Sequence, residues 1–281
     1  MEIHDINNLY TTSNIDSSMF HYEGELIIPF DPSWKSIAVN VSGGADSAFL
    51  SCALAKIIKN NNYDCKIHFI SFVRVWEFRP WAPFISKEVY DKIKFLFPSI
   101  IGDRIESFIP TELEEGVSGS NLYQNKSGDR ILVNSFNKFA IYKFNLDAVY
   151  NATTLNPSDK SIGIINEANK RPKDREISWY KNRGINALIN LEEMEKNKSV
   201  TLYPLRYVDK TFVINGYVNN NWLDIFNTTR SCEGDKNSNP DLFSSYLGYK
   251  HKESKLPLCG QCFWCVEREW ALKQSGLENE A

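Results

Sequence analysis

The sequence predicts an α/β fold built on a doubly wound parallel sheet. Apolar, β-branched stretches at residues 36–41 and 66–75 are each followed by a stretch with helical spacing of apolar residues. This strand-helix-strand-helix order is typical of a parallel sheet with helices on both faces. The chain has 281 residues, of which 42 % are hydrophobic. It is therefore long enough for one large domain with a sizeable core.

The first two strands and their helices can be placed from the pattern. After the strand at 36–41, apolar residues from Phe49 to Ile58 recur at helical spacing, and three asparagines end the helix. The second strand is expected at 66–75. Ser86 is expected to cap the second helix, and Pro98 to stop it.

The middle of the chain is less regular. A polar stretch rich in glycine and serine, residues 112–130, predicts a loop at a functional edge. A helix follows with an apolar stripe, then a strand at 148–154, a polar helical stretch at 157–200 and a last strand-like piece at 200–205. The expected stripe consists of Phe136, Phe139, Ala140 and Phe144.

Charge and hydropathy exclude several classes of protein. The formal net charge of -3 gives no global basic field for nucleic acid. No apolar run approaches the roughly 18 residues of a membrane span. The N-terminus shows no basic and apolar regions of a secretory signal. We therefore expect a cytoplasmic protein without a membrane partner, and a homodimer is compatible with the sequence.

The stretch Ser42-Gly43-Gly44-Ala45-Asp46-Ser47 joins the first strand to its helix. Glycines permit close backbone approach, and the unpaired N–H groups of a helix start attract anions. An ordinary tight turn, with Asp46 or Ser47 as a cap, is the alternative. No Gly-Lys-Ser/Thr follows, so this is not a Walker A loop. Asp46 is better suited to Mg²⁺ than to direct contact with phosphate oxygens, which it would repel.

Four of the six cysteines gather near the C-terminus. Cys259, Cys262 and Cys265 follow a C-x-x-C-x-x-C spacing, and Cys232 supplies a fourth thiol. Four thiolates are the usual ligands of a structural Zn²⁺ ion. An iron–sulfur cluster, a redox pair and plain buried thiols remain open. The other two cysteines, at 52 and 65, are expected to be small core residues.

The stretch at 42–47 resembles the S-G-G-x-D-S loop of the PP-loop (N-type) ATP pyrophosphatases. The resemblance implies a HUP-type, Rossmann-like parallel sheet and cleavage of ATP between its α and β phosphates, with a carbonyl or carboxylate activated as an adenylate. It assigns ATP binding to the loop residues Ser42, Gly43, Gly44, Ala45, Asp46 and Ser47.

The C-terminal part is similar to the 7-cyano-7-deazaguanine synthase (QueC) family. The matching stretches are "YPLRYVDKTFVINGYVNNNWLDIFNTTRSC" and "CGQCFWCVERE". The resemblance brackets residues 36–272 and implies one PP-loop domain over 1–281, with an N-terminal extension 1–33 and a zinc-binding segment 228–281. The matching positions are Pro204, Leu205, Lys210, Thr229, Ser231, Cys232, Cys259, Gly260, Cys262, Cys265 and Arg268.

The chain departs from that family around the expected acceptor pocket. "LVNSFN" keeps Asn137 but lacks the family's arginine, and "TLNPSD" keeps Asn156 and Asp159 but lacks its glycine. An aromatic stretch at 74–84 is longer than in the family. It could stack a flat base, or it could be an aromatic plug or a partner surface. Its aromatic residues are Trp76, Phe78, Trp81 and Phe84.

The resemblance implies an ATP-dependent carbon–nitrogen ligase that uses ATP, Mg²⁺ and Zn²⁺. Its substrate would be a 7-carboxy-7-deazaguanine-type carboxylate, passed to ammonia or to an amine of a protein or nucleotide, in queuosine biosynthesis or an antiviral or phage pathway. Asp46, Lys210 and Arg268 are the expected catalytic residues. An exposed lysine and a helix salt bridge are the ordinary alternatives for the last two. A PP-loop RNA-modifying enzyme, such as a thiolase, and an inactive nucleotide-binding partner are the competing functions.

Overall fold

The structure is a computed structural model that describes residues 20–23, 26–74, 81–109, 128–157, 200–232, 258–260 and 262–277. Several expectations lie outside these residues. They are the polar helical stretch after residue 157, most of the expected loop at 112–130, Trp76, Phe78 and Asp159.

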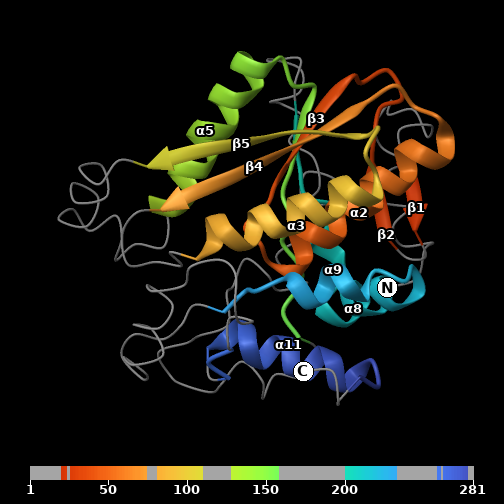
Figure 1. The fold of residues 1–281 in the computed structure, drawn as a ribbon, viewed down its shortest axis with the longest axis vertical. Helices are drawn as coiled ribbons and strands as arrows, with labels where there is room; N and C mark the ends of the chain where they lie inside the picture. The colour runs from red at the N-terminus through yellow and green to blue at the C-terminus, as the bar shows by residue number, and fades with distance from the viewer. Residues whose placement is uncertain are drawn as a thin grey trace.

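A five-stranded parallel sheet forms the centre of the fold (Figure 1). Its strands lie in the order β5-β4-β3-β6-β7, so the first strand along the chain is the central one. This is the doubly wound, Rossmann-like order, in which the chain winds outward first to one side and then to the other. The predicted fold class is confirmed. The strands are β3 (Ser36–Asn40), β4 (Lys66–Arg74), β5 (Ile101–Ile109), β6 (Ala148–Tyr150) and β7 (Val200–Leu202).

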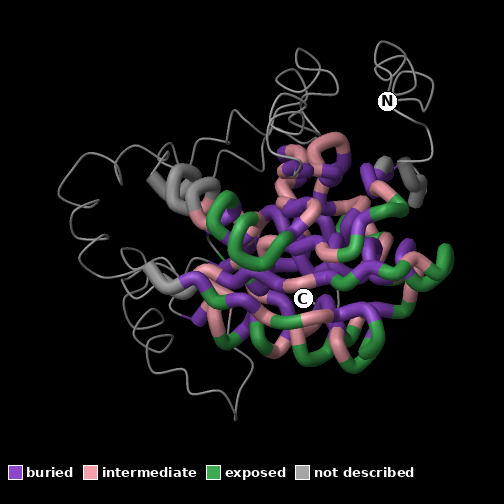
Figure 2. The backbone as a smooth tube through the Cα atoms, turned by 90° about the horizontal axis from the view of Figure 1, so that it is seen from above, coloured by how far each residue is buried: buried purple, intermediate pink, exposed green. Residues whose placement is uncertain are grey.

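Helices cover both faces of this sheet. Helices α2 (Ala45–Asn61) and α3 (Ala82–Leu96) lie on one face, and α5 (Gly128–Phe144) lies on the other (Figure 1). Alternate residues of β3 belong to the two cores: Val39 packs on the α2 side, and Ala38 packs with Ala140 of α5. Both faces are therefore dry, as a parallel sheet requires. Figure 2 shows the buried backbone through the middle and exposed segments at the periphery.

Two further groups of elements flank the sheet. An antiparallel hairpin, β1 (Phe20–Glu23) and β2 (Leu26–Pro29), precedes it, and Leu26 and Ile28 of this hairpin are buried in the main core. The single domain over 1–281, with its N-terminal extension 1–33 and its zinc-binding segment 228–281, stays a prediction. Beyond the sheet come η5 (Pro204–Tyr207), α8 (Lys210–Asn219), α9 (Leu223–Thr228) and α11 (Phe263–Gln274).

Helix α8 packs between α2 and α11. Gly216 of α8 lies against the ring of Phe49 on α2, where a Cβ atom would overlap the ring. A glycine at this position therefore brings the C-terminal helices close to the helix that follows the glycine loop.

Two local predictions are wrong. Ser86 is not the N-cap of α3, because that helix begins a turn earlier, with Trp81 as its N-cap and a proline in its first turn. Ser86 is instead buried, and its Oγ donates to Ser71 Oγ at 2.8 Å. The predicted stripe of α5 also fails in part. Ala140 is buried, but Phe139 and Phe144 are 53 % and 42 % exposed.

None of the helices in the described part of the chain combines the length and the apolar character that a membrane span requires.

Candidate functional site: a glycine loop joined to a cysteine cluster

The glycine loop has the backbone of an anion cradle. β3 ends at Asn40, and α2 begins at Ala45 with Gly44 as its N-cap residue. No side chain caps this helix, so the predicted alternative of a turn capped by Asp46 or Ser47 is not what the structure shows. Gly43 has φ +84°, and a Cβ there would lie 2.9 Å from Ile85 Cγ2. Glycine at this position satisfies both the backbone conformation and the close approach of α3.

The loop opens into a cavity of about 180 Å³. This cavity lies beyond the carboxyl ends of β3 and β6, which are neighbours in the sheet. The two strands are the point where the winding changes direction, and doubly wound proteins bind ligands at this switch point. The lining residues are Asn40, Ser42, Gly44, Asp46, Ser47, Asn151, Ala152, Thr153, Thr154, Ser231 and Trp264.

Two of the predicted ATP-binding residues, Gly43 and Ala45, are not among the residues that line the cavity. Gly43 turns its carbonyl outward to accept the N–H of Arg230 at 2.8 Å. Ala45 is buried, and its carbonyl accepts the hydroxyl of Tyr217 at 2.7 Å. Both positions therefore attach the loop to the C-terminal part of the chain.

A segment from the C-terminal part, residues 229–232, runs along the loop. Besides the Arg230 hydrogen bond, Ser231 Oγ lies so close to Gly44 that a Cβ atom there would be only 2.7 Å from it. The next residue is Cys232 of the cysteine cluster. The glycine loop therefore contacts a short segment whose last residue is one of the four cysteines.

A buried group of charges lies beside the loop. Lys210, the first residue of α8, donates from Nζ to both carboxylate oxygens of Asp46 at 2.5 Å. The Lys210 side chain is 3 % exposed, which excludes the alternative of an ordinary surface lysine. Glu267 Oε2 of α11 is 3.6 Å from the same Nζ, and Glu267 is fully buried. Asp46 is the most accessible of the three, with 15 % of its side chain exposed.

Arg268 lies behind the 229–232 segment and does not line the cavity. Its guanidinium is 3.8 Å from the centre of the Phe226 ring, and Nη1 donates to Thr229 Oγ1 at 3.2 Å. Burial, together with the charge of Arg230, lowers the pKa of Arg268 to about 10. The group therefore stays charged at neutral pH. Its predicted catalytic role stays a prediction.

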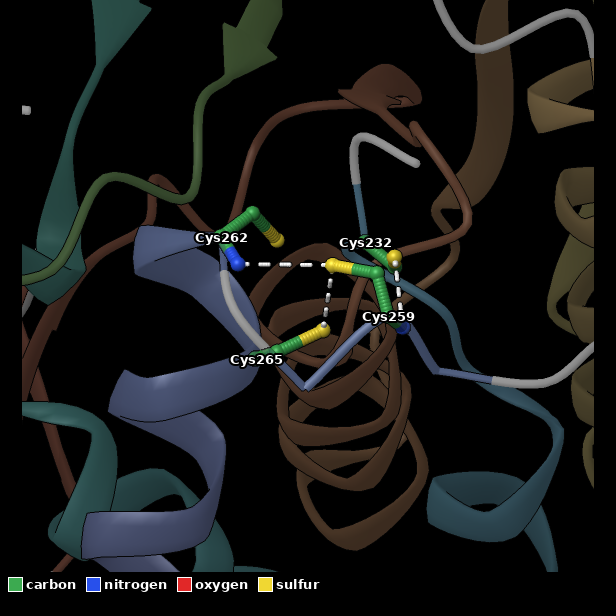
Figure 3. Close-up of side chains that lie close together, drawn as sticks. All are labelled: Cys232, Cys259, Cys262 and Cys265. Carbon is green, nitrogen blue, oxygen red and sulfur yellow. Dashed lines mark hydrogen bonds between the residues drawn. The ribbon is translucent and has the colours of Figure 1, made fainter. Parts of the chain in front are cut away.

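The four predicted metal ligands come together (Figure 3). The sulfur atoms of Cys232, Cys259, Cys262 and Cys265 all lie within 4.8 Å of one another, and those of Cys259 and Cys265 are 3.8 Å apart. A tetrahedral ion with metal–sulfur bonds of about 2.3 Å needs sulfur atoms about 3.8 Å apart. The donor set therefore fits one thiophilic ion.

The four thiols lie close together, and three of them are buried. Hydrogen bonds to Cys232 and Cys262, together with burial, raise the pKa of the Cys265 thiol. A cation would reverse this, because it stabilises thiolates outright. Backbone N–H groups of Cys259 and Cys262 already donate to neighbouring sulfurs at 3.3 Å each. By contrast, Cys52 and Cys65 are buried core residues, as predicted.

Sequence reasoning missed several residues of the site. Asn40 donates from Nδ2 to Asn151 Oδ1 at 2.6 Å, so the two strand ends share an amide pair at the cavity. Polar residues at the ends of two adjacent parallel strands were the available signal. Trp264 and Glu267, inside "CFWCVERE", gave none. Of the expected aromatic stretch, Trp81 is 1 % exposed and belongs to the core.

No protein-family model matches the chain, and no curated protein matches it. Among solved structures it is similar to the U34-tRNA thiolase NcsA from Methanococcus maripaludis, solved with its [4Fe-4S] cluster. The identity is 12 % and the TM-score 0.39, over 87 % of this chain and 67 % of that one. With a likeness this distant, the fold assignment rests on the strand order.

Proposed function

We propose that the chain is an ATP-dependent adenylating enzyme of the PP-loop type. Its substrate is the carboxylate of a 7-carboxy-7-deazaguanine-like heterocycle, which it passes to ammonia or to another amine. One observation carries the proposal. The S-G-G-A-D-S loop opens an uncapped helix start into the cavity at the switch point of the sheet, with a buried lysine on its aspartate.

The loop suits a polyphosphate. The first N–H groups of α2 face the side from which an anion would come, and the helix dipole favours negative charge there. The hydroxyls of Ser42 and Ser47 lie at the same cavity. Since the loop contains no lysine, Lys210 supplies the positive charge from α8, and Asp46 is suited to hold Mg²⁺ with the pyrophosphate.

The proposed reaction follows from these parts. A carboxylate oxygen attacks the α-phosphorus of ATP, and the bond to the bridging oxygen of the β-phosphate breaks, so that pyrophosphate leaves with the electron pair. Ammonia then attacks the acyl carbon, AMP leaves, and a proton is lost, which gives the amide. A second ATP activates the amide oxygen, and loss of AMP and two N–H protons gives the nitrile. Fixed positive charge near the transferring phosphorus stabilises the transition state.

The cavity has features of a site for a flat heterocycle. The indole of Trp264 offers an apolar surface for stacking, and Asn40 and Asn151, which also line the cavity, offer amide donors and acceptors. A ring held between such groups would bring its carboxylate to the loop. This arrangement supports an aromatic carboxylate more than an aliphatic one.

For the cysteine cluster we propose a structural zinc ion. Four protein thiolates leave no open position for catalysis. The sulfur atoms stand at the spacing of a single tetrahedral ion. In a [4Fe-4S] cluster each thiolate binds a different iron, so the four sulfurs would lie farther apart. Metal analysis of the purified protein decides between the two.

The test is a product analysis. The protein is incubated with ATP, Mg²⁺, 7-carboxy-7-deazaguanine and ammonium, and the products are separated by mass spectrometry. We expect AMP, pyrophosphate and the mass of the amide or the nitrile. Asp46→Asn should abolish AMP release, whereas Asp64→Asn, which changes an aspartate with an 88 % exposed side chain, should not.

Other outcomes discriminate between the functions. AMP release that depends on the added carboxylate, with no nitrogen incorporated into the product, points to an amine other than ammonia. Sulfur transferred to an RNA would instead support the RNA-modifying alternative. ADP as the nucleotide product, or AMP release that survives Asp46→Asn, would overturn the proposal.

A further inference from the structure

Glu267 is a fully buried carboxylate that neither the loop nor the cysteine spacing accounts for. It lies on α11, two residues after Cys265, and its Oε2 is 3.6 Å from Lys210 Nζ. Lys210 in turn holds both oxygens of Asp46 at 2.5 Å. The ammonium group is therefore flanked by two carboxylates, one from the glycine loop and one from the helix that starts at the cysteine cluster.

The position of Glu267 is set by the cluster. Cys262 is the N-cap residue of α11, and Cys265 is in its first turn. The helix packs against α8, which begins with Lys210. The sulfur ligands therefore fix the first turn of α11, and this turn fixes the carboxylate beside Lys210.

The two carboxylates have different surroundings. Glu267 has no exposed surface, whereas 15 % of the Asp46 side chain is exposed at the cavity. Asp46 is therefore the one that can turn to a ligand. When it binds Mg²⁺ with a polyphosphate, Lys210 loses part of its pairing, and Glu267 is the carboxylate that stays with it.

We propose that Glu267 is a positioning residue that holds the Lys210 ammonium toward the glycine loop when Asp46 turns to the magnesium-bound pyrophosphate. The proposal rests on the proposed function, because Lys210 acts on the transferring phosphorus there. Without Glu267, no carboxylate holds the Lys210 ammonium in place once Asp46 has turned to the magnesium-bound pyrophosphate. The defect then appears in the chemical step more than in the binding of ATP.

The first test separates these two steps. Glu267→Gln keeps the size of the side chain and removes its charge. We expect kcat for AMP formation to fall on the order of 10- to 100-fold, as for a misplaced catalytic group, while the KM for ATP changes less than about threefold. The matched control is Glu269→Gln, two residues along the same helix, which is 53 % exposed and paired with Lys273. This control should keep the wild-type kcat.

A double-mutant cycle shows whether Glu267 acts through Lys210. If it does, Lys210→Met with Glu267→Gln is no slower than Lys210→Met alone. Multiplying defects would overturn the proposal, because they would mean that Glu267 acts through another route. A loss of kcat accompanied by an equal loss in the Glu269→Gln control would also overturn it.

A third measurement does not depend on turnover. The proteins are treated with an amine-reactive acylating reagent, and the labelling of each lysine is followed by peptide mass spectrometry. Glu267→Gln should speed labelling of Lys210 and leave Lys273 unchanged. If the wild type releases no AMP, the proposed function fails while this result still decides the role of Glu267. Equal labelling of Lys210 in the wild type and Glu267→Gln would refute the positioning role.

Discussion

The glycine loop and the cysteine-bearing part of the chain build the same site by different means. The loop is six consecutive residues, 42–47, between a central strand and its helix, and it is surrounded by buried residues such as Val39 and Ala48. The cysteine-bearing part joins two separate segments, 229–232 and 258–277, through four sulfur atoms. Local sequence thus shapes the glycine loop, while the charges around it depend on a distant segment.

This difference predicts that the two regions respond differently to loss of metal. The strands of the sheet are held by their own ladder and by helices on both faces. The cysteine-bearing part packs on the α2 side of the same core, through residues such as Leu272, and its two segments meet at the four thiols. The following predictions test the comparison, beginning with the largest expected effect.

Cys262→Ser should release the metal and loosen the C-terminal part. A structural zinc site contributes on the order of 10 kcal/mol to folding. We expect limited proteolysis to cut within residues 229–277 while peptides of β3, α2 and β4 stay protected. Elemental analysis should show the metal lost. Cys65→Ala, which removes a buried thiol on the sheet side, should retain the metal. An unchanged cleavage pattern in metal-free Cys262→Ser would contradict the expected dependence.

Gly43→Ala should destabilise the loop more than an equivalent change in the other region. Gly43 and Gly276 have φ of +84° and +71°, but only at Gly43 would a Cβ meet a neighbour, Ile85, at 2.9 Å. A left-handed non-glycine residue costs about 1–2 kcal/mol, and the contact adds to this at Gly43 alone. Urea denaturation of Gly43→Ala and Gly276→Ala measures the difference. Equal losses would mean that α3 moves freely away from the loop.

Trp264→Leu should weaken binding of the heterocycle about tenfold, since stacking of one base on an aromatic ring contributes about 1–3 kcal/mol. The KM for ATP should stay the same, because the loop is intact. Trp264→Phe is the control that keeps a ring and most of the affinity. Steady-state kinetics with each substrate in turn gives the two constants. A tenfold change in the KM for ATP would place the indole at the nucleotide instead.

The buried thiols of the sheet side should resist alkylation even after chelation, whereas the four cluster cysteines should become reactive once the metal is removed. Burial raises the pKa of Cys65 from 9.0 to about 12. At pH 8 this thiol is protonated and unreactive in the folded state. N-ethylmaleimide with peptide mass spectrometry should label the four cluster cysteines only after chelation, and Cys52 and Cys65 in neither case. Labelling of Cys65 before unfolding would show that the sheet side opens.

The same shift gives an effect of pH on the free energy of unfolding that appears only above about pH 9. The folded thiol of Cys65 keeps its proton up to a pH of about 12, whereas the unfolded thiol loses it near 9.0. The contribution of the buried Cys65 thiol to the free energy of unfolding is therefore complete below pH 9. It decreases as the pH rises from about 9 to about 12.

The sequence predicted the central elements because their signals are local. Residues 36–41 and 66–75 are apolar runs bounded by turn residues, and β3 and β4 lie there. Strand β5 gave no such signal. Its pairing with β4 shifts register between Ile67 and Phe69, so Ile101 packs in the core on the α2 side and Ile105 packs in the core on the α5 side. No element was therefore predicted at these residues.

Only those residues of the candidate site that follow a recognisable sequence spacing could be predicted. The loop residues and the four cysteines were found because glycine conformations and thiolate ligands impose a sequence pattern. Trp264 and Glu267 have no such pattern, because they meet the loop only through the packing of α11 on α8. The buried position of Ser86 also depends on tertiary packing, because its hydroxyl pairs with Ser71 of β4 and does not cap the helix.

The pairing of Lys210 with Asp46 spans 164 positions of the chain. During synthesis from the N-terminus, the aspartate is made long before its ammonium partner, and Glu267 is made later still. Throughout that interval the cradle already has its glycines but lacks both the lysine and the cysteine-bound helix. The order of translation therefore postpones the charged groups of the proposed ATP site until α11 has been made, whereas the glycines of the loop are made early.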